Sequence, residues 1–237
     1  MKNIITYENL HYFAYSNDKL CRGKVKGIVL DFFGLGAQLM YDDHPWGIEL
    51  ALQNIILVIP YNNPWAWMNR QAVDYTDEII DVLFAHYGIN DLPIVASGGS
   101  MGGLSALVYS AYARRTPVRC VASCPVCDLP YHYTERPDLP RTLYSAFFSC
   151  ADMDSALRSA SPLHLAMDGR MPDIDYFIFH CSRDSAVNIN AHSEKLVNIL
   201  RHNRRVEYTI VMDRDHCDLT EQALCEYRKS ITDAFCH

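Results

Sequence analysis

The segment PIVASGGSMGGLSALVYSAYARR, residues 93–115, decides the fold of this chain. It begins with a short apolar run, passes through four glycines around Ser100, and continues with apolar residues at helical spacing. Glycine is costly inside helices and strands, so this dense cluster indicates a backbone path that only a residue without a Cβ can follow. The segment therefore predicts a strand, a sharp turn at Ser100 and a helix.

Short apolar, β-rich runs recur along the chain and alternate with helical patterns. The predicted strands cover residues 25–32, 55–59, 93–97, 119–123, 176–180 and 206–211, and residues 5–16 predict an antiparallel edge. The predicted helices cover residues 71–87, 101–114, 191–203 and 219–235. Short runs that are continuously apolar are typical of strands covered on both faces. The alternation predicts an α/β fold with a mostly parallel central sheet and helices on both faces.

The composition predicts a globular protein with a sizeable core. Of the 237 residues, 49% are hydrophobic and 21% are charged, which favours one domain over residues 1–237. The net charge is −7 and Lys and Arg form no long run, so we expect a small-molecule partner rather than nucleic acid or a membrane. The chain starts without the apolar core of a signal peptide, and its apolar runs are too short to cross a bilayer, which predicts a cytoplasmic location. The sequence predicts no oligomeric state.

Residues 128–167 interrupt the alternation of strands and helices. This stretch is rich in Pro, Tyr, Arg and Ser, and it predicts about two short helices and no strand. An insertion between two strands fits a cap over a site, with an extra helical hairpin packed on the sheet edge as an equal alternative. Arg136 and Arg141 would attract an acidic substrate, although solvated ion pairs are the favoured explanation for both.

Nine cysteines are scattered through the chain, which favours reduced thiols in a protein large enough to fold without disulfides. Only Cys124 and Cys127 have the spacing of a redox pair. A redox pair usually stands at the start of a helix, whereas a proline follows here almost at once, so this remains a minor alternative.

Ser100 lies in Gly98-Gly99-Ser100-Met101-Gly102, which matches the Gly-x-Ser-x-Gly pattern of a nucleophile elbow. The pattern lacks the Lys-Ser/Thr ending of a phosphate loop and the spacing of a dinucleotide motif. A tight structural turn is the plain alternative, but the predicted strand and helix on either side favour a nucleophile. The backbone N–H of Met101, at the start of the helix, would then point at an oxyanion.

A serine nucleophile needs a histidine base and a carboxylate to orient it, in the order Ser, acid, His in this type of fold. Asp184 follows the predicted strand 176–180, and His216 follows the strand 206–211, so both lie where open α/β sheets place functional groups. The competitors are less well placed: Asp173 and Asp175 precede their strand, Asp213, Asp215 and Asp218 would cap the last helix, and His180, His192, His202 and His237 have structural or terminal positions.

A second oxyanion donor is expected from the loop at residues 32–38, which follows the first strand of the core sheet. Gly34 and Gly36 allow the backbone to approach closely, and we take the N–H of Leu35 as the donor over those of the two glycines. Such a donor is worth about 3 to 4 kcal/mol of transition-state stabilisation.

With these residues in place, the chain resembles the α/β-hydrolase superfamily, and within it the prolyl-oligopeptidase-like serine hydrolases and related esterases. The stretches GGSMGG, SPLHLA, FHCSRDSAVNINAHSEKLVNILRHNRRVEYTIV and DRDHCDL carry the resemblance, which covers roughly residue 25 to residue 237 without the large propeller of the peptidase members. The resemblance implies a triad of Ser100, His216 and Asp184, the same residues that the spacing singles out.

The chain departs from the family pattern at two positions. Phe33 precedes Gly34 where the family usually has His-Gly, so the hydrogen bonds that support the oxyanion loop must differ. Cys181 replaces the glycine of the usual His-Gly-x-x-Asp acid motif. Neither change removes a member of the triad.

The sequence thus predicts a cofactor-independent serine hydrolase, without a metal, that acts on a carboxylic ester of a small or medium acyl group. Two alternatives stay open: a peptidase on short peptides, and an inactive binding protein that retains the fold. The absent propeller weakens the peptidase alternative, and the changed oxyanion loop is the only sign of the inactive one. Aromatic residues at 60–71 and Trp46 would line the substrate pocket or simply pack.

Overall fold

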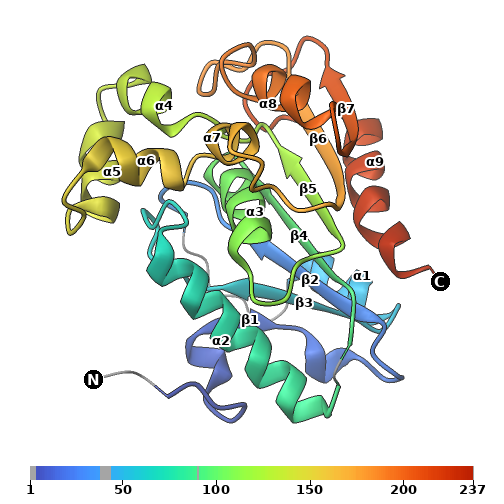
Figure 1. The fold of residues 1–237 in the computed structure, drawn as a ribbon. Helices are drawn as coiled ribbons and strands as arrows, with labels where there is room; N and C mark the ends of the chain where they lie inside the picture. Colours follow the sequence, from blue (N-terminus) through green and yellow to red (C-terminus); the bar gives the residue numbers. More distant parts are fainter. Residues whose placement is uncertain (1–3, 38–43, 90, 237) are drawn as a thin grey trace.

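The computed structural model describes residues 4–37, 44–89 and 91–236, and two predicted positions, Gln38 and His237, lie outside them. Seven strands form one sheet in the order β1-β3-β2-β4-β5-β6-β7 (Figure 1). Their bounds are β1 Ala14–Ser16, β2 Gly27–Phe32, β3 Ile55–Pro60, β4 Ile94–Gly99, β5 Arg119–Ser123, β6 Asp175–Cys181 and β7 Arg205–Val211. All neighbouring strands are parallel except β1, which runs antiparallel to β3 at the edge.

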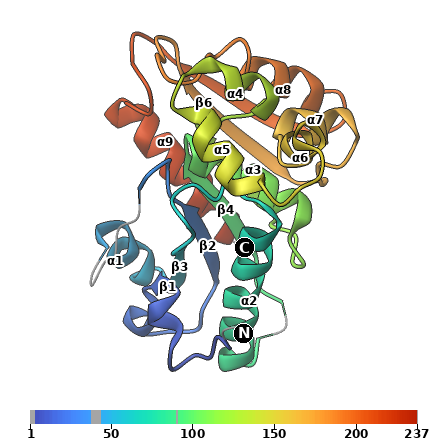
Figure 2. The same ribbon diagram turned by 90° about the vertical axis from the view of Figure 1, so that its left-hand side faces the viewer.

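Helices cover both faces of this sheet (Figure 2). Their bounds are α1 Pro45–Ala51, α2 Arg70–Tyr87, α3 Met101–Tyr112, α4 Leu129–Glu135, α5 Leu139–Phe147, α6 Met153–Ser159, α7 Pro162–Met167, α8 Ser193–Leu200 and α9 Glu221–Thr232. Along β2, Ile28 and Leu30 join the core shared with α2 and α3, whereas Val29 joins the core shared with α1 and α9. Because successive strand side chains point to opposite faces, this alternation gives a three-layer sandwich.

The predicted α/β fold with a mostly parallel sheet is confirmed, and six predicted core strands lie within two residues of their observed bounds. Three details differ. The antiparallel edge strand has only three residues, the helix α1 was not predicted, and the insertion at 128–167 holds four short helices, α4 to α7, instead of about two. Asp128 and Asp152 cap α4 and α6 through side-chain hydrogen bonds, which explains how helices this short persist.

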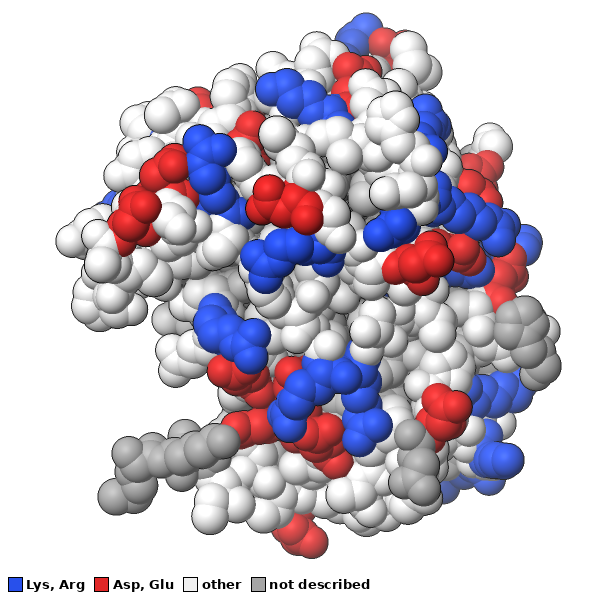
Figure 3. Space-filling view, in the orientation of Figure 1, with Lys and Arg blue, Asp and Glu red and all other residues white. Residues whose placement is uncertain are grey.

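Charged side chains of both signs are interspersed over the face seen in Figure 3. Within the described ranges, every helix is too short or too polar to cross a membrane.

Candidate active site

Ser100 occupies the turn between β4 and α3, with φ of 59° and ψ of −123°. This conformation is strained for a residue with a Cβ, and such strain is typical of functional turns. The neighbouring glycines are required by close backbone contacts. A Cβ on Gly102 would lie 2.1 Å from the carbonyl oxygen of Phe32, and a Cβ on Gly98 would lie 2.5 Å from the carbonyl carbon of Gly102. The predicted sharp turn is therefore present, and β2 and α3 hold it in place.

An acid–base pair reaches the same end of the sheet from two other strands. Asp184 follows β6 and His216 follows β7, and the Nδ1 of His216 lies 2.7 Å from the Oδ2 of Asp184. The side chain of Asp184 is fully buried, while that of His216 is partly exposed. The other carboxylate oxygen of Asp184 accepts the backbone N–H groups of Ala186 and Val187 at 2.9 and 2.8 Å. These bonds fix the carboxylate, and the carboxylate fixes the plane of the imidazole.

The electrostatics of this pair favour an ionised acid and a basic imidazole. Burial alone would raise the pKa of Asp184, but hydrogen bonds from His180 and His216 lower it well below its usual value. Burial would lower the pKa of His216, but the hydrogen bond and the charge of Asp184 raise it above its usual value. His180, expected to be structural, lies fully buried beneath the pair, with its Nε2 3.3 Å from the Oδ2 of Asp184.

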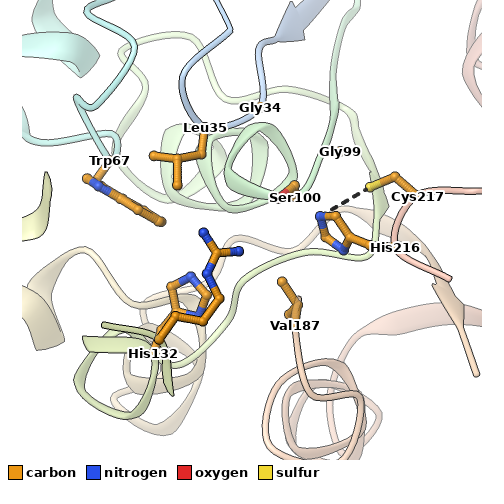
Figure 4. Close-up of a pocket in the computed structure, with 10 residues that line it drawn as sticks. Gly34, Leu35, Trp67, Gly99, Ser100, His132, Val187, His216 and Cys217 are labelled. Atoms are coloured by element: carbon orange, nitrogen blue, oxygen red, sulfur yellow. Dashed lines mark hydrogen bonds between the residues drawn. The ribbon is translucent and has the colours of Figure 1, made fainter. Parts of the chain in front are cut away.

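A cavity of about 460 Å³ opens above these residues (Figure 4). Its walls come from loops at the carboxyl ends of the strands and from the insertion, and they comprise Gly34, Leu35, Trp67, Gly99, Ser100, His132, Arg136, Val187, His216 and Cys217. Figure 4 shows Ser100, His216 and Cys217 at one end of this cavity and Leu35 and Trp67 at the other. The volume is that of a small-molecule site.

The structure brings Ser100, His216 and Asp184 together, although Ser100 Oγ makes no hydrogen bond with His216 among the residues described. The Nε2 of His216 lies instead 3.8 Å from the Sγ of Cys217. Hydrogen bonds of this kind are often long in unliganded sites and tighten when substrate binds. The catalytic roles of the three residues remain predictions.

The structure bears differently on the two predicted oxyanion donors. Met101 is the first residue of α3, so its N–H has no carbonyl partner within the helix. In the loop after β2, the N–H of Gly36 donates to the carbonyl of Pro64 at 3.1 Å, which removes Gly36 from the alternatives. Gly34 and Leu35 both line the cavity, so the choice of Leu35 over Gly34 remains a prediction.

The insertion forms one wall of the cavity through α4 and the residue that follows it. Glu135 accepts hydrogen bonds from the Nδ1 of His132 at 2.6 Å and from the Nε2 of His192 at 3.0 Å. The Nδ1 of His192 accepts the backbone N–H groups of Cys127 and Asp128, which fixes its tautomer. Because Glu135 also accepts the N–H of Asn188, this network ties α4 to the loop that carries Asp184.

Several residues that line the cavity were not predicted, among them His132, Val187 and Cys217. Cys217 alone had a signal in the sequence, since it directly follows His216. The aromatic residues at 60–71 and Trp46 were expected either to line the pocket or simply to pack. Trp67 lines the cavity, whereas Trp46 packs on Arg228 away from it.

One expectation about the competing carboxylates was wrong. Asp213, Asp215 and Asp218 do not cap the last helix, because Thr220 accepts the N–H of Ala223 there. The three carboxylates instead pair with Arg183, with the N–H and Oγ of Ser185, and with Arg214. The loop after β7 is thus fixed to the loop after β6 by polar contacts.

The sulfurs of Cys124 and Cys127 have different neighbours. Cys124 Sγ accepts the backbone N–H groups of Cys181 and Cys217, both at 3.4 Å, whereas Cys127 Sγ donates to the carbonyl of Pro125. A hydrogen bond from the Cys217 thiol, against the effect of burial, lowers the pKa of Cys124. Cys124 is therefore buried behind Cys217, which lines the cavity.

Comparison with known proteins gives structural relatives only. No family model and no curated protein matches the sequence. The structure superposes on dipeptidyl peptidase 4 of Porphyromonas gingivalis with a TM-score of 0.72 and 15% identity, over 94% of this chain and 33% of that one. A puromycin-hydrolyzing peptidase of Mycobacterium tuberculosis matches with a TM-score of 0.67 and 16% identity, over 90% and 34% of the two chains. Esterase B from Lactobacillus rhamnosis matches with a TM-score of 0.67 and 13% identity, over 90% and 78%.

The chain spans about a third of the length of the two peptidases and most of the length of the esterase. At these identities the likeness concerns the arrangement of the backbone. The chain has the α/β-hydrolase fold, as its sequence resemblance predicted.

Proposed function

We propose that this protein is a serine hydrolase that cleaves a carboxylic ester of a small or medium acyl group through an acyl-enzyme. One observation carries the proposal: a strained serine faces a cavity together with a histidine whose Nδ1 lies 2.7 Å from a buried carboxylate. A serine hydroxyl becomes an effective nucleophile in that setting.

Each residue has a defined part in the reaction. Ser100 Oγ attacks the ester carbonyl carbon while the Nε2 of His216 accepts its proton, and Asp184 stabilises the imidazolium that forms. The N–H groups of Met101 and Leu35 donate to the oxyanion. His216 then protonates the leaving alcohol, and water, activated by the same imidazole, releases the acid and restores Ser100.

Labelling by a serine-directed fluorophosphonate, followed by intact-mass measurement, tests the nucleophile. The native protein should gain one adduct, whereas the Ser100→Ala variant should gain none. Ser105 serves as a matched control, since it lies one turn along α3 with its hydroxyl bonded to the carbonyl of Met101. A Ser105→Ala variant should label as the native protein does, and labelling retained in Ser100→Ala would overturn the proposal.

A peptidase acting on short peptides is the second candidate, and the two peptidases among the structural relatives favour it. Turnover of acyl nitrophenyl esters should be compared with that of aminoacyl amides carrying the same acyl part. A higher kcat/KM on the amides would replace the esterase by the peptidase.

An inactive binding protein is the third candidate, and the 3.8 Å approach of Cys217 Sγ to the Nε2 of His216 favours it, because the sulfur faces the nitrogen that Ser100 needs. Absence of both labelling and turnover, while a known hydrolase reacts, would establish this alternative.

A further inference from the structure

Three side chains with metal-binding atoms meet at the Ser100 end of the cavity. The Sγ atoms of Cys124 and Cys217 and a ring nitrogen of His216 all lie within 4.8 Å of one another. The Nδ1 of His216 is bonded to Asp184, so the Nε2, which lies 3.8 Å from Cys217 Sγ, is the nitrogen that faces the sulfurs. Two sulfurs and one imidazole nitrogen are ligands that Zn²⁺ prefers in proteins.

The backbone is bent so that the two sulfurs face each other. Cys124 has φ of 44° and Cys217 has φ of 57°, a left-handed conformation that is uncommon for residues other than glycine. The Sγ of Cys124 is buried and accepts two backbone N–H groups, an arrangement that stabilises a thiolate. Cys217 Sγ packs against Gly99, and a Cβ added to Gly99 would lie only 3.3 Å from this sulfur.

The surroundings of His216 also suit a metal ligand. Histidines that bind metals usually donate their other ring N–H to a carboxylate, which fixes the tautomer and makes the free nitrogen more basic. Asp184 does this for His216 at 2.7 Å. The three proposed ligand atoms are two sulfurs and one nitrogen, whereas Mg²⁺ and Ca²⁺ bind through oxygen ligands.

We propose that Cys124, Cys217 and the Nε2 of His216 form an inhibitory site for a thiophilic divalent cation such as Zn²⁺. The cation displaces the thiol protons, and it takes the imidazole lone pair that would otherwise accept the proton of Ser100. His216 and Cys217 line the cavity, so the fourth coordination position is open to water. The inhibitory effect rests on the proposed hydrolase function, whereas the metal binding does not.

Cobalt binding tests the site without any need for activity. Co²⁺ is titrated into the full chain, with a phosphine reductant present to keep the cysteines reduced, and thiolate-to-cobalt charge-transfer absorption is recorded. The native protein should bind one Co²⁺ with this absorption, and Zn²⁺ should abolish it by displacement. Cys217→Ser should bind at least about 100-fold more weakly and lose most of the absorption.

Cys225 provides a matched control, because it is also an exposed thiol but lies on α9, outside the cluster. Cys225→Ser should bind cobalt as the native protein does. Circular dichroism checks that each variant is folded, and the serine in Cys217→Ser differs from the native exposed cysteine by one atom. Absence of the charge-transfer band from the native protein, or its persistence in Cys217→Ser, would overturn the proposal.

Inhibition is then measured on whichever substrate the enzyme turns over, with each variant compared with its own metal-free rate. Zn²⁺ should inhibit the native enzyme and Cys225→Ser, a chelator should restore both, and Cys217→Ser should need at least about 100-fold more Zn²⁺. Cobalt binding without inhibition of an active enzyme would overturn the inhibitory role. If neither fluorophosphonate labelling nor turnover is found, the hydrolase proposal fails, and the cobalt titration still decides whether the site exists.

Discussion

The Asp184→Asn substitution tests the proposed mechanism most directly, because the structure determines which way the new amide must face. One carboxylate oxygen accepts two backbone N–H groups, from Ala186 and Val187. An amide would keep its oxygen there and turn its NH₂ group toward His216 and His180. The ring N–H groups of His216 and His180 would then both point at the NH₂, donor against donor. His216 can avoid this contact only by moving its proton from Nδ1 to Nε2.

A proton on Nε2 prevents His216 from accepting the proton of Ser100. We expect kcat to fall about 10⁴-fold, which corresponds to roughly 5 kcal/mol of lost transition-state stabilisation. KM should change little, since Asp184 is buried and does not line the cavity. The assay is the hydrolysis of an acyl nitrophenyl ester in the presence of a chelator.

Asp213→Asn is the matched control, because it makes the same chemical change three residues from His216 at an exposed carboxylate paired with Arg183. Its kcat should stay within a factor of about two, the size expected for a surface ion pair. A folded Asp184→Asn variant that retained more than a tenth of the native kcat would refute the assignment of Asp184.

Three further predictions follow from the same contacts. The kcat/KM should rise with pH as His216 loses its proton, with a midpoint above the usual 6.5, because Asp184 raises the pKa of the imidazole; a pH profile of the chelated enzyme with a midpoint below 6.5 would contradict this. Gly102→Ala places a Cβ 2.1 Å from the carbonyl oxygen of Phe32 and should destabilise the protein by about 1 to 3 kcal/mol in urea unfolding, more than Gly34→Ala, whose Cβ has room. Glu135→Gln replaces an acceptor of two imidazole N–H groups and should lower the unfolding free energy by about 1 to 3 kcal/mol, and an unchanged urea midpoint would exclude this.

The core of the fold was predictable because it depends on local patterns. Parallel strands covered on both faces are typically short apolar runs, and the six runs singled out in the sequence all form strands. The helix α1 escaped prediction because it has only seven residues and no side-chain cap. The number of helices in the insertion was not predicted either. Each has at most nine residues, and so short a stretch shows too few helical repeats to be distinguished from a loop.

The candidate site could be predicted where topology determines position. The carboxyl ends of parallel strands meet at one edge, so Ser100, Asp184 and His216 were expected to converge from their order along the chain. No such rule predicts which residues form the far wall of the cavity. His132 reaches it because Glu135 links α4 to His192, a contact between residues 57 apart that no local pattern contains.

The loop after β7 places His216 through contacts and not through its own backbone preference. Asp213 and Cys217, on either side of the histidine, both have left-handed φ values, which L-residues adopt only when the surroundings favour them. Their N–H groups donate to Ser182 Oγ at 2.9 Å and to Cys124 Sγ at 3.4 Å, so the sulfur of Cys124 is one of the anchors for the base. The same sulfur is a proposed metal ligand. Replacing Cys124 should therefore disturb catalysis and metal binding together, whereas Cys217→Ser removes a sulfur but keeps the N–H anchor, which is why that variant separates the two effects.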